Sequence, residues 1–135
     1  MVWSPWVDVS SEALERYKTS PRLQIDFLPL SLIQWGKESY EPVERTDESE
    51  RYLSPSKYPF HSDIPVFIHV GTAELLYDEV KGLWKKMAAV PGNLIGYTET
   101  KNAPHDIIVA GGYTGFVKQA EESAEAAREF FGIDM

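Results

Sequence analysis

The chain has 135 residues, with 21 acidic and 13 basic side chains and a formal net charge of −8. Such a charge repels the phosphate backbone, so we expect no nucleic-acid partner. The absence of cysteine excludes disulfides, thiolate catalysis and cysteine-based metal sites. No apolar run approaches the roughly 20 residues of a membrane span, and the N-terminus lacks the basic start of a signal peptide. We therefore expect a cytoplasmic protein without a membrane span.

The chain opens with residues that are typical of a buried strand. Residues 2–8 carry two tryptophans directly after Met1, whereas free termini usually have polar, poorly ordered residues. This composition predicts a truncated chain. Ser10 is then placed to cap a short helix that contains Ala13 and Tyr17.

Residues 18–63 have the least regular pattern of the chain. Proline limits any helix around residues 26–35 to a start near residue 28. An acidic stretch follows at residues 44–50. We expect a surface excursion with short helices. Its prolines are Pro21, Pro29, Pro42, Pro55 and Pro59.

Regular structure is predicted again from residue 64 onward. Residues 64–71 are almost continuously apolar, as in a parallel strand that is covered on both faces. Residues 74–90 carry one apolar stripe at helical spacing. A strand at residues 94–98 and a loop at 101–106 follow.

The C-terminal part is predicted to end in a helix. Apolar residues share one face from Val117 to Phe131, and Gly132 stops the pattern. Gly111 and Gly112 are expected to cap a turn before it. Alternating strands and helices predict an α/β fold with about three parallel strands in one domain, residues 1–135. Three strands leave sheet edges that need covering.

Glu74 and His105 are the candidate catalytic residues. Each follows a predicted strand, and functional groups gather at the carboxyl ends of parallel strands. Together they would form the orienting acid and the general base of a triad. Taken singly, Glu74 is better explained as a helix-start carboxylate stabilised by the helix dipole, and His105 as a surface loop histidine.

The other histidines and the serines do not complete a site. His69 is expected to be a hydrogen-bonded structural residue within its strand, and His61 to lie on the surface. No histidine pair has metal-ligand spacing, so we predict no metal and no cofactor. No serine stands in a G-x-S-x-G nucleophile elbow. Without the elbow glycines, we do not expect a nucleophile in Ser4, Ser31 or Ser54.

The sequence resembles the α/β-hydrolase fold-3 group, the hormone-sensitive-lipase-like esterases, and within it the fungal esterase and deacetylase branch. Two segments are the more specific, as a spaced pair: residues 64–79, similar to the seventh strand and its acid loop, and residues 103–107, similar to the histidine loop. Residues 4–8 are similar to the sixth strand and the loop after it, and residues 52–55 to the Ser-Pro turn before the seventh strand. The resemblance covers only the C-terminal portion of the family's length.

The resemblance implies the fold of a partial α/β hydrolase and, in a complete enzyme, ester hydrolysis. A serine from the missing half would attack the acyl carbon, His105 would carry the proton, and Glu74 would orient the imidazole. The family usually has aspartate at the position of Glu74. The implied substrate is a small carboxylic ester or an acetylated metabolite.

Three alternatives for the function follow from the missing serine. The chain is the C-terminal fragment of a serine ester hydrolase, an inactive truncated remnant, or a non-catalytic partner protein whose sheet edge another subunit completes. In each case we expect no His105-dependent ester hydrolysis by the chain alone. We also expect marginal stability, dye binding or self-association through residues 2–8, because an unpaired apolar strand is an aggregation template.

Overall fold

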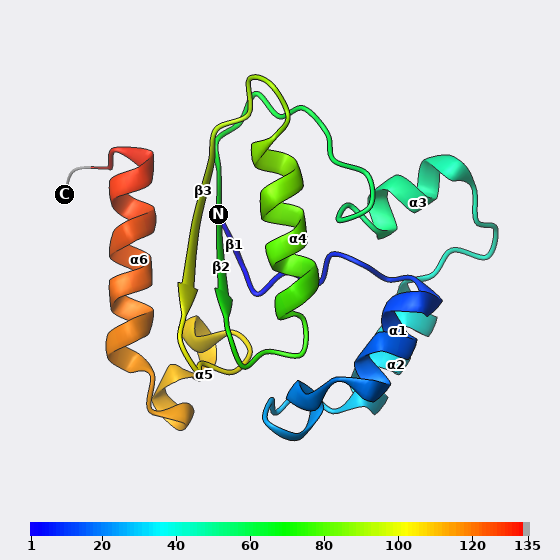
Figure 1. Ribbon diagram of the computed structural model, residues 1–135, viewed down its shortest axis with the longest axis horizontal. Coiled ribbons are helices and arrows are strands. Elements are labelled where there is room, and N and C mark those ends of the chain that lie inside the picture. Colours follow the sequence, from blue (N-terminus) through cyan, green and yellow to red (C-terminus); the bar gives the residue numbers. More distant parts are fainter. Residues whose placement is uncertain (134–135) are drawn as a thin grey trace.

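A computed structural model describes residues 1–133 and shows one parallel sheet with helices on both faces (Figure 1). The strand order is β1-β2-β3. Both pairings are parallel, with Val2 opposite Ile68 and Val66 opposite Ile95. The three strands are β1 (Val2–Trp3), β2 (Val66–Gly71) and β3 (Ile95–Thr100). The predicted α/β class and the number of parallel strands are confirmed.

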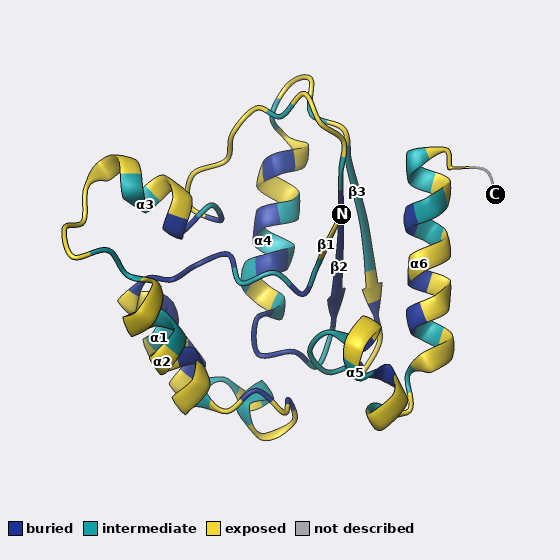
Figure 2. Ribbon diagram, turned by 180° about the vertical axis from the view of Figure 1, so that it is seen from behind, coloured by how far each residue is buried: buried dark blue, intermediate teal, exposed yellow. Residues whose placement is uncertain are grey.

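The central strand β2 is buried on both faces, as its apolar pattern predicts (Figure 2). Ile68 and Val70 join a core cluster with residues of helix α4 (Tyr77–Ala88). On the opposite face, the centre of the Phe67 ring lies 5.6 Å from the centre of the Phe130 ring in helix α6 (Val117–Phe131). Each fully buried apolar side chain contributes roughly 1.5–3 kcal/mol. The two helices therefore fix β2, and β2 in turn fixes the loops at its carboxyl end.

The excursion between β1 and β2 contains short helices, as expected. Helix α1 (Ser11–Thr19) begins after Ser10, whose hydroxyl accepts from the Ala13 amide at 3.2 Å. It packs against helix α2 (Leu30–Tyr40) beside the sheet (Figure 1). The remaining elements are a 3₁₀ helix (Pro21–Gln24), α2 (Leu30–Tyr40) and α3 (Asp47–Leu53). The helix predicted to start near residue 28 thus begins at Leu30, after Pro29.

The expected turn at Gly111 and Gly112 is wrong, because both glycines lie inside helix α5 (Ile107–Thr114). Glycine is a poor helix former, but burial outweighs this cost. Ile107 is fully buried with Ala103 and Ala120. A Cβ at Gly111 would lie 3.3 Å from the Phe116 carbonyl carbon, so glycine lets α5 approach the start of α6. The chain turns at Gly115 instead, with a φ of 81°.

Candidate active site

Glu74 and His105 lie at the carboxyl end of the sheet, on two successive connections. Glu74 is in the loop between β2 and α4, and His105 is in the loop between β3 and α5. Because β2 and β3 are parallel neighbours, their carboxyl ends lie side by side. The fold therefore brings together two residues that are far apart in the sequence.

The two side chains face each other across these loops. His105 Nδ1 lies 3.3 Å from Glu74 Oε2, at the long end of the hydrogen-bonding range. The Glu74 side chain is fully buried, whereas 21% of the His105 side chain is exposed. The predicted juxtaposition is confirmed, while the catalytic roles stay predictions. Since Nδ1 faces the carboxylate, Nε2 is the imidazole nitrogen left to exchange a proton with another group.

The other carboxylate oxygen of Glu74 is held by two donors of the chain itself. The Ser4 hydroxyl donates to Oε1 at 2.6 Å, and the Gly71 amide also donates to Oε1. These bonds occupy one oxygen and leave Oε2 for the imidazole. Glu74 is thus fixed in rotation as well as in position, which is what an orienting acid requires.

Burial raises the pKa of the Glu74 carboxyl above its ordinary value, although hydrogen bonds from His105, Ser4 and Gly71 lower it in part. A buried carboxylate is costly unless it is paired. When His105 accepts a proton at Nε2, the resulting imidazolium provides this pairing.

Gly71 allows the histidine loop to approach the end of β2. A Cβ at this position would overlap the Ala103 carbonyl group and would lie 2.8 Å from the Pro104 carbonyl oxygen. The loops are bonded at this point, since the Ala73 amide donates to the Ala103 carbonyl at 3.0 Å. Glycine is therefore a condition of the spacing between Glu74 and His105.

Ser4 is a site residue that sequence reasoning missed. Its hydroxyl donates to Glu74 and accepts from the Asp106 amide at 3.0 Å, so it connects the acid to the histidine loop. Ser4 and Asp106 have φ values of 42° and 46°, in the left-handed region that non-glycine residues rarely occupy. Strain of this kind is concentrated at functional sites. The sequence feature that could have identified Ser4 as a site residue is its position at the end of a strand, directly before Pro5.

Ser4 itself is no substitute for the nucleophile, in agreement with its sequence context. It is 3% exposed and its proton is committed to Glu74. Ser54 is fully buried, and Ser31 lies on the exposed side of α2. Burial thus makes Ser4 and Ser54 inaccessible to a substrate, and none of the described hydrogen bonds pairs Ser31 with a base.

The other two histidines lie where the sequence predicts. His69 is fully buried in β2, and its Nε2 is 2.9 Å from the Thr100 hydroxyl. Burial lowers the pKa of His69 to about 4, so this residue is neutral near neutral pH. His61 is on the surface beside Asp63. His105 differs from His61 in that its carboxylate partner, Glu74, is fully buried, whereas Asp63 is exposed.

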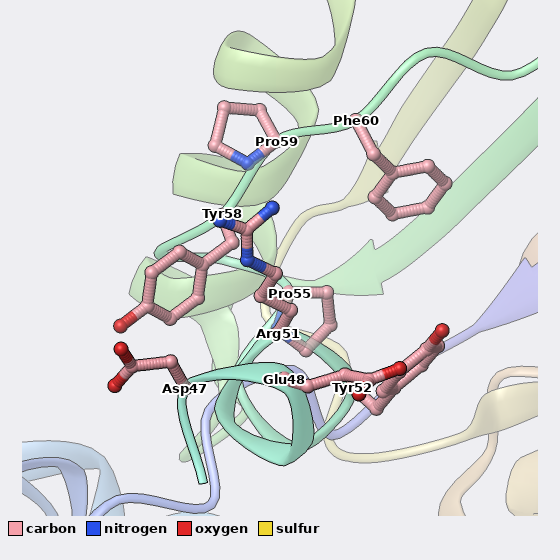
Figure 3. A pocket seen from close by; sticks show the side chains of 8 residues that line it. All are labelled: Asp47, Glu48, Arg51, Tyr52, Pro55, Tyr58, Pro59 and Phe60. Atoms are coloured by element: carbon pink, nitrogen blue, oxygen red, sulfur yellow. The ribbon is translucent and has the colours of Figure 1, made fainter.

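A groove of about 770 Å³ lies away from this pair, along α3 and the segment that follows it (Figure 3). Its walls combine aromatic rings and prolines with three charged side chains. The lining residues are Asp47, Glu48, Arg51, Tyr52, Pro55, Tyr58, Pro59 and Phe60. The groove lacks a histidine and does not include the candidate acid and base.

Two further properties concern residues 1–133 as a whole. Within this range, no three histidine, aspartate or glutamate side chains gather as the ligands of a metal ion would. Among the helices of the same range, none has both the length and the apolar composition to cross a membrane.

Comparisons with solved structures identify the fold. The chain is similar to a hormone-sensitive lipase from a metagenome library, with a TM-score of 0.63 and 24% identity over 96% of this chain. It is also similar to EstE1, a thermophilic and thermostable carboxylesterase cloned from a metagenomic library, with a TM-score of 0.59 and 19% identity over 98% of this chain. No protein-family model and no curated protein matches the sequence.

These likenesses confirm the predicted partial α/β-hydrolase fold, and both neighbours bear names of the esterase and lipase group that the sequence motifs resemble. The chain spans 41% of the first structure and 43% of the second. It therefore has the fold of somewhat less than half of a lipase or carboxylesterase of this kind.

Proposed function

We propose that this chain belongs to the hormone-sensitive-lipase-like group and carries the acid and the base of a serine ester hydrolase. The observation that supports this most directly is the contact between Glu74 Oε2 and His105 Nδ1 at the carboxyl end of a parallel sheet. A buried acid, a half-buried histidine and a free Nε2 are the parts that a triad needs besides its nucleophile.

The proposed reaction proceeds in two steps through an acyl-enzyme. A serine hydroxyl attacks the acyl carbon of the ester while His105 Nε2 takes its proton. The tetrahedral intermediate collapses, and His105 returns the proton to the leaving alcohol. Water then attacks the acyl-enzyme by the same proton transfers and releases the acid. Glu74 holds the imidazole and stabilises its charged form in both steps.

The serine and the oxyanion donors would come from polypeptide outside this sequence, which contains no G-x-S-x-G motif. The outer edge of β1 offers a place where this additional polypeptide could join the sheet. Within residues 1–133, β1 pairs only with β2, and its outer edge can accept a further parallel strand. A strand added there would bring its carboxyl end next to Ser4, and thus next to Glu74 and His105.

The substrate class follows from the same proposal. We propose small carboxylic esters or acetylated metabolites, the class that the motif resemblance implies. The names of the two structural neighbours, a lipase and a carboxylesterase, agree with ester substrates.

The experiment begins with the reading frame upstream of Met1. An in-frame G-x-S-x-G codon run there would supply the nucleophile, and the longer product would be assayed with an activated ester. We expect His105→Ala to lower kcat/KM by about 10³-fold or more. His61→Ala, which removes an exposed histidine, is the matched control and should leave it unchanged. Full activity in His105→Ala would exclude the proposed base.

A second candidate is a non-catalytic subunit whose β1 edge is completed by another chain. The exposure of Met1 and Val2 at that edge, 58% and 37%, favours it. An upstream region without the serine motif, together with a defined oligomer in size-exclusion chromatography, would support this candidate. The absence of both would leave an inactive remnant.

A further inference from the structure

Asp26 connects the two loops that carry the candidate acid and base. It belongs to the excursion, in the short segment between the 3₁₀ helix and α2. Asp26 Oδ2 accepts from the Leu75 amide at 2.8 Å, and Oδ1 accepts from the His105 amide at 3.1 Å. Leu75 is the residue next to Glu74. One carboxylate thus holds the main chain beside the acid and the main chain of the base itself.

The segment that carries Asp26 is itself anchored to the acid loop. Arg22 Nε donates to the Thr72 carbonyl at 3.0 Å, and Arg22 also pairs with Asp78 at 2.7 Å. The Asp26 amide in turn donates to the Arg22 carbonyl at 2.9 Å. Since this segment is fixed on the end of β2 by independent contacts, Asp26 acts on His105 from a rigid base.

The chemistry of the side chain matches this task. An ionised carboxylate has only acceptors, so its two oxygens can serve two amides at the same time. An asparagine in this place would offer one oxygen and would turn an NH₂ group toward the second amide. Asp26 is 8% exposed, so water cannot easily replace a lost acceptor.

The next residue extends the contact to the imidazole ring. The Phe27 ring lies edge-on to the His105 ring, 6.1 Å between centres, and Phe27 is 51% exposed. Asp26 therefore fixes the backbone of His105, and the residue that follows Asp26 lies beside the imidazole ring.

We propose that Asp26 is a positioning residue that sets the spacing between Glu74 and His105. The importance of this positioning role for catalysis rests on the proposed function. The effect on the histidine loop, however, is a property of this chain and can be measured without ester hydrolysis.

The three histidines of the chain provide the measurement. Diethyl pyrocarbonate modifies accessible neutral imidazoles, and peptide mass spectrometry resolves the rates at His61, His69 and His105. His61 is the exposed reference and the fully buried His69 reports global unfolding. Hydrogen exchange of the Leu75 and His105 amides gives a second readout on the same samples.

Asp26→Asn should release the histidine loop. We expect His105 to react several-fold faster, toward the rate of His61, while His69 stays protected. The Leu75 or His105 amide should exchange on the order of tenfold faster, because a hydrogen bond to a charged acceptor is lost. Unchanged reactivity of His105 with unchanged amide exchange would overturn the proposal.

Asp8→Asn is the matched control. Asp8 is 2% exposed, accepts from the Ser10 amide at 3.0 Å and pairs with Arg16, and none of its described hydrogen bonds reaches either loop. The same loss of charge at Asp8 should leave the modification rate of His105 unchanged. An increase in that rate equal to the increase in Asp26→Asn would overturn the proposal.

If Asp26→Asn makes His69 reactive, the variant has unfolded, and Asp26→Ser then provides the test. That variant keeps one acceptor without an opposing NH₂, and faster reaction of His105 with His69 protected is again expected. Unchanged reactivity of His105 would again refute the role.

Discussion

The carboxyl end of the sheet and the outer edge of β1 are built in opposite ways. At the carboxyl end, Ser4, Gly71 and Glu74 are joined by hydrogen bonds within the chain, and buried groups hold His105 in place. At the edge of β1, apolar side chains such as Met1 and Val2 are exposed. Glu74 and His105 are therefore positioned by this chain alone, while the edge of β1 that would receive the proposed nucleophile-bearing strand is unpaired in residues 1–133.

The difference between these two regions shows which contacts each part of the proposed chemistry depends on. Proton transfer depends on short-range contacts between loops that β2 and β3 bring together. Supply of the nucleophile depends on a strand-to-strand contact at β1. Substitutions at the two places should consequently have different signatures: loss of folding stability at the carboxyl end, and changed association at the edge.

The largest effect is expected from Gly71→Ala at the carboxyl end. The added Cβ would overlap the Ala103 carbonyl and push the histidine loop away from β2. We expect a loss of about 3 kcal/mol in the free energy of unfolding, measured by urea denaturation. Gly82→Ala is the matched control, because a Cβ there meets no atom within 4 Å inside α4. It should stabilise the chain by up to about 1 kcal/mol. Equal effects of the two substitutions would contradict the close approach.

Ser4 allows strain and hydrogen bonding to be separated. Ser4→Ala leaves Oε1 of Glu74 and the Asp106 amide short of one partner, which costs about 1–3 kcal/mol. Ser4→Gly loses the same bonds but accepts the φ of 42° without strain. We expect the glycine variant to be about 1 kcal/mol more stable than the alanine variant. A glycine variant that is less stable than the alanine variant would show that the left-handed backbone of Ser4 is not costly.

Much of this carboxyl end could be predicted from the sequence, because its signals are local. The apolar run of β2, the stripe of α4 and the loop position of His105 each follow from periodicity or from punctuation by proline and glycine. The contacts of Ser4 and Asp26 could not be predicted in this way. The contacts of Ser4 depend on the pairing of β1 with β2. Those of Asp26 depend on where the excursion folds back, and no spacing in the sequence indicates that an aspartate at position 26 will accept from the amides at 75 and 105.

The α5 helix shows the second limit of the sequence. Its two glycines favour a turn by propensity, and only the burial of Ile107 against α6 makes the helix the better solution. The catalytic roles likewise need more than the spacing of Glu74 and His105. A carboxylate at a helix start and a histidine in a loop have ordinary explanations until the structure shows their side chains in contact.

Glu74→Gln tests the cost of the buried acid. Burial raises the pKa of Glu74, so its contribution to stability is fully present below the unfolded value of 4.5 and is lost as the pH rises through the higher folded pKa. Glutamine carries no charge and keeps an oxygen for Ser4 and Gly71. We therefore expect the variant to unfold at a higher temperature than the parent at pH 7, and the gain to disappear near pH 4. Exposed Glu121→Gln is the control. A less stable Glu74→Gln variant at pH 7 would mean that pairing with His105 outweighs burial.

The smallest change in folding stability, and the sharpest test of the edge, is expected from Val2→Lys. Val2 is 37% exposed on β1, so the substitution should alter the free energy of unfolding by no more than about 0.5 kcal/mol. A lysine on an edge strand opposes pairing with another chain, because its charge would be buried in the new sheet. If the isolated chain self-associates through residues 2–8, Val2→Lys should shift its mass in light scattering toward the monomer and lower its binding of hydrophobic dyes.

Val109→Lys separates the edge from general surface hydrophobicity. Val109 is 74% exposed on the helix α5, and the substitution adds the same charge and removes the same side chain. Only the β1 variant should dissociate the assembly, because Val2 lies on an edge strand whereas Val109 lies on a helix. If both lysine variants shift the mass of the assembly equally, association depends on apolar surface in general. The β1 edge would then not be supported as the place where a nucleophile-bearing strand pairs. Monomeric parent protein with a sharp unfolding transition would go further, since it would show that three strands suffice for a stable fold.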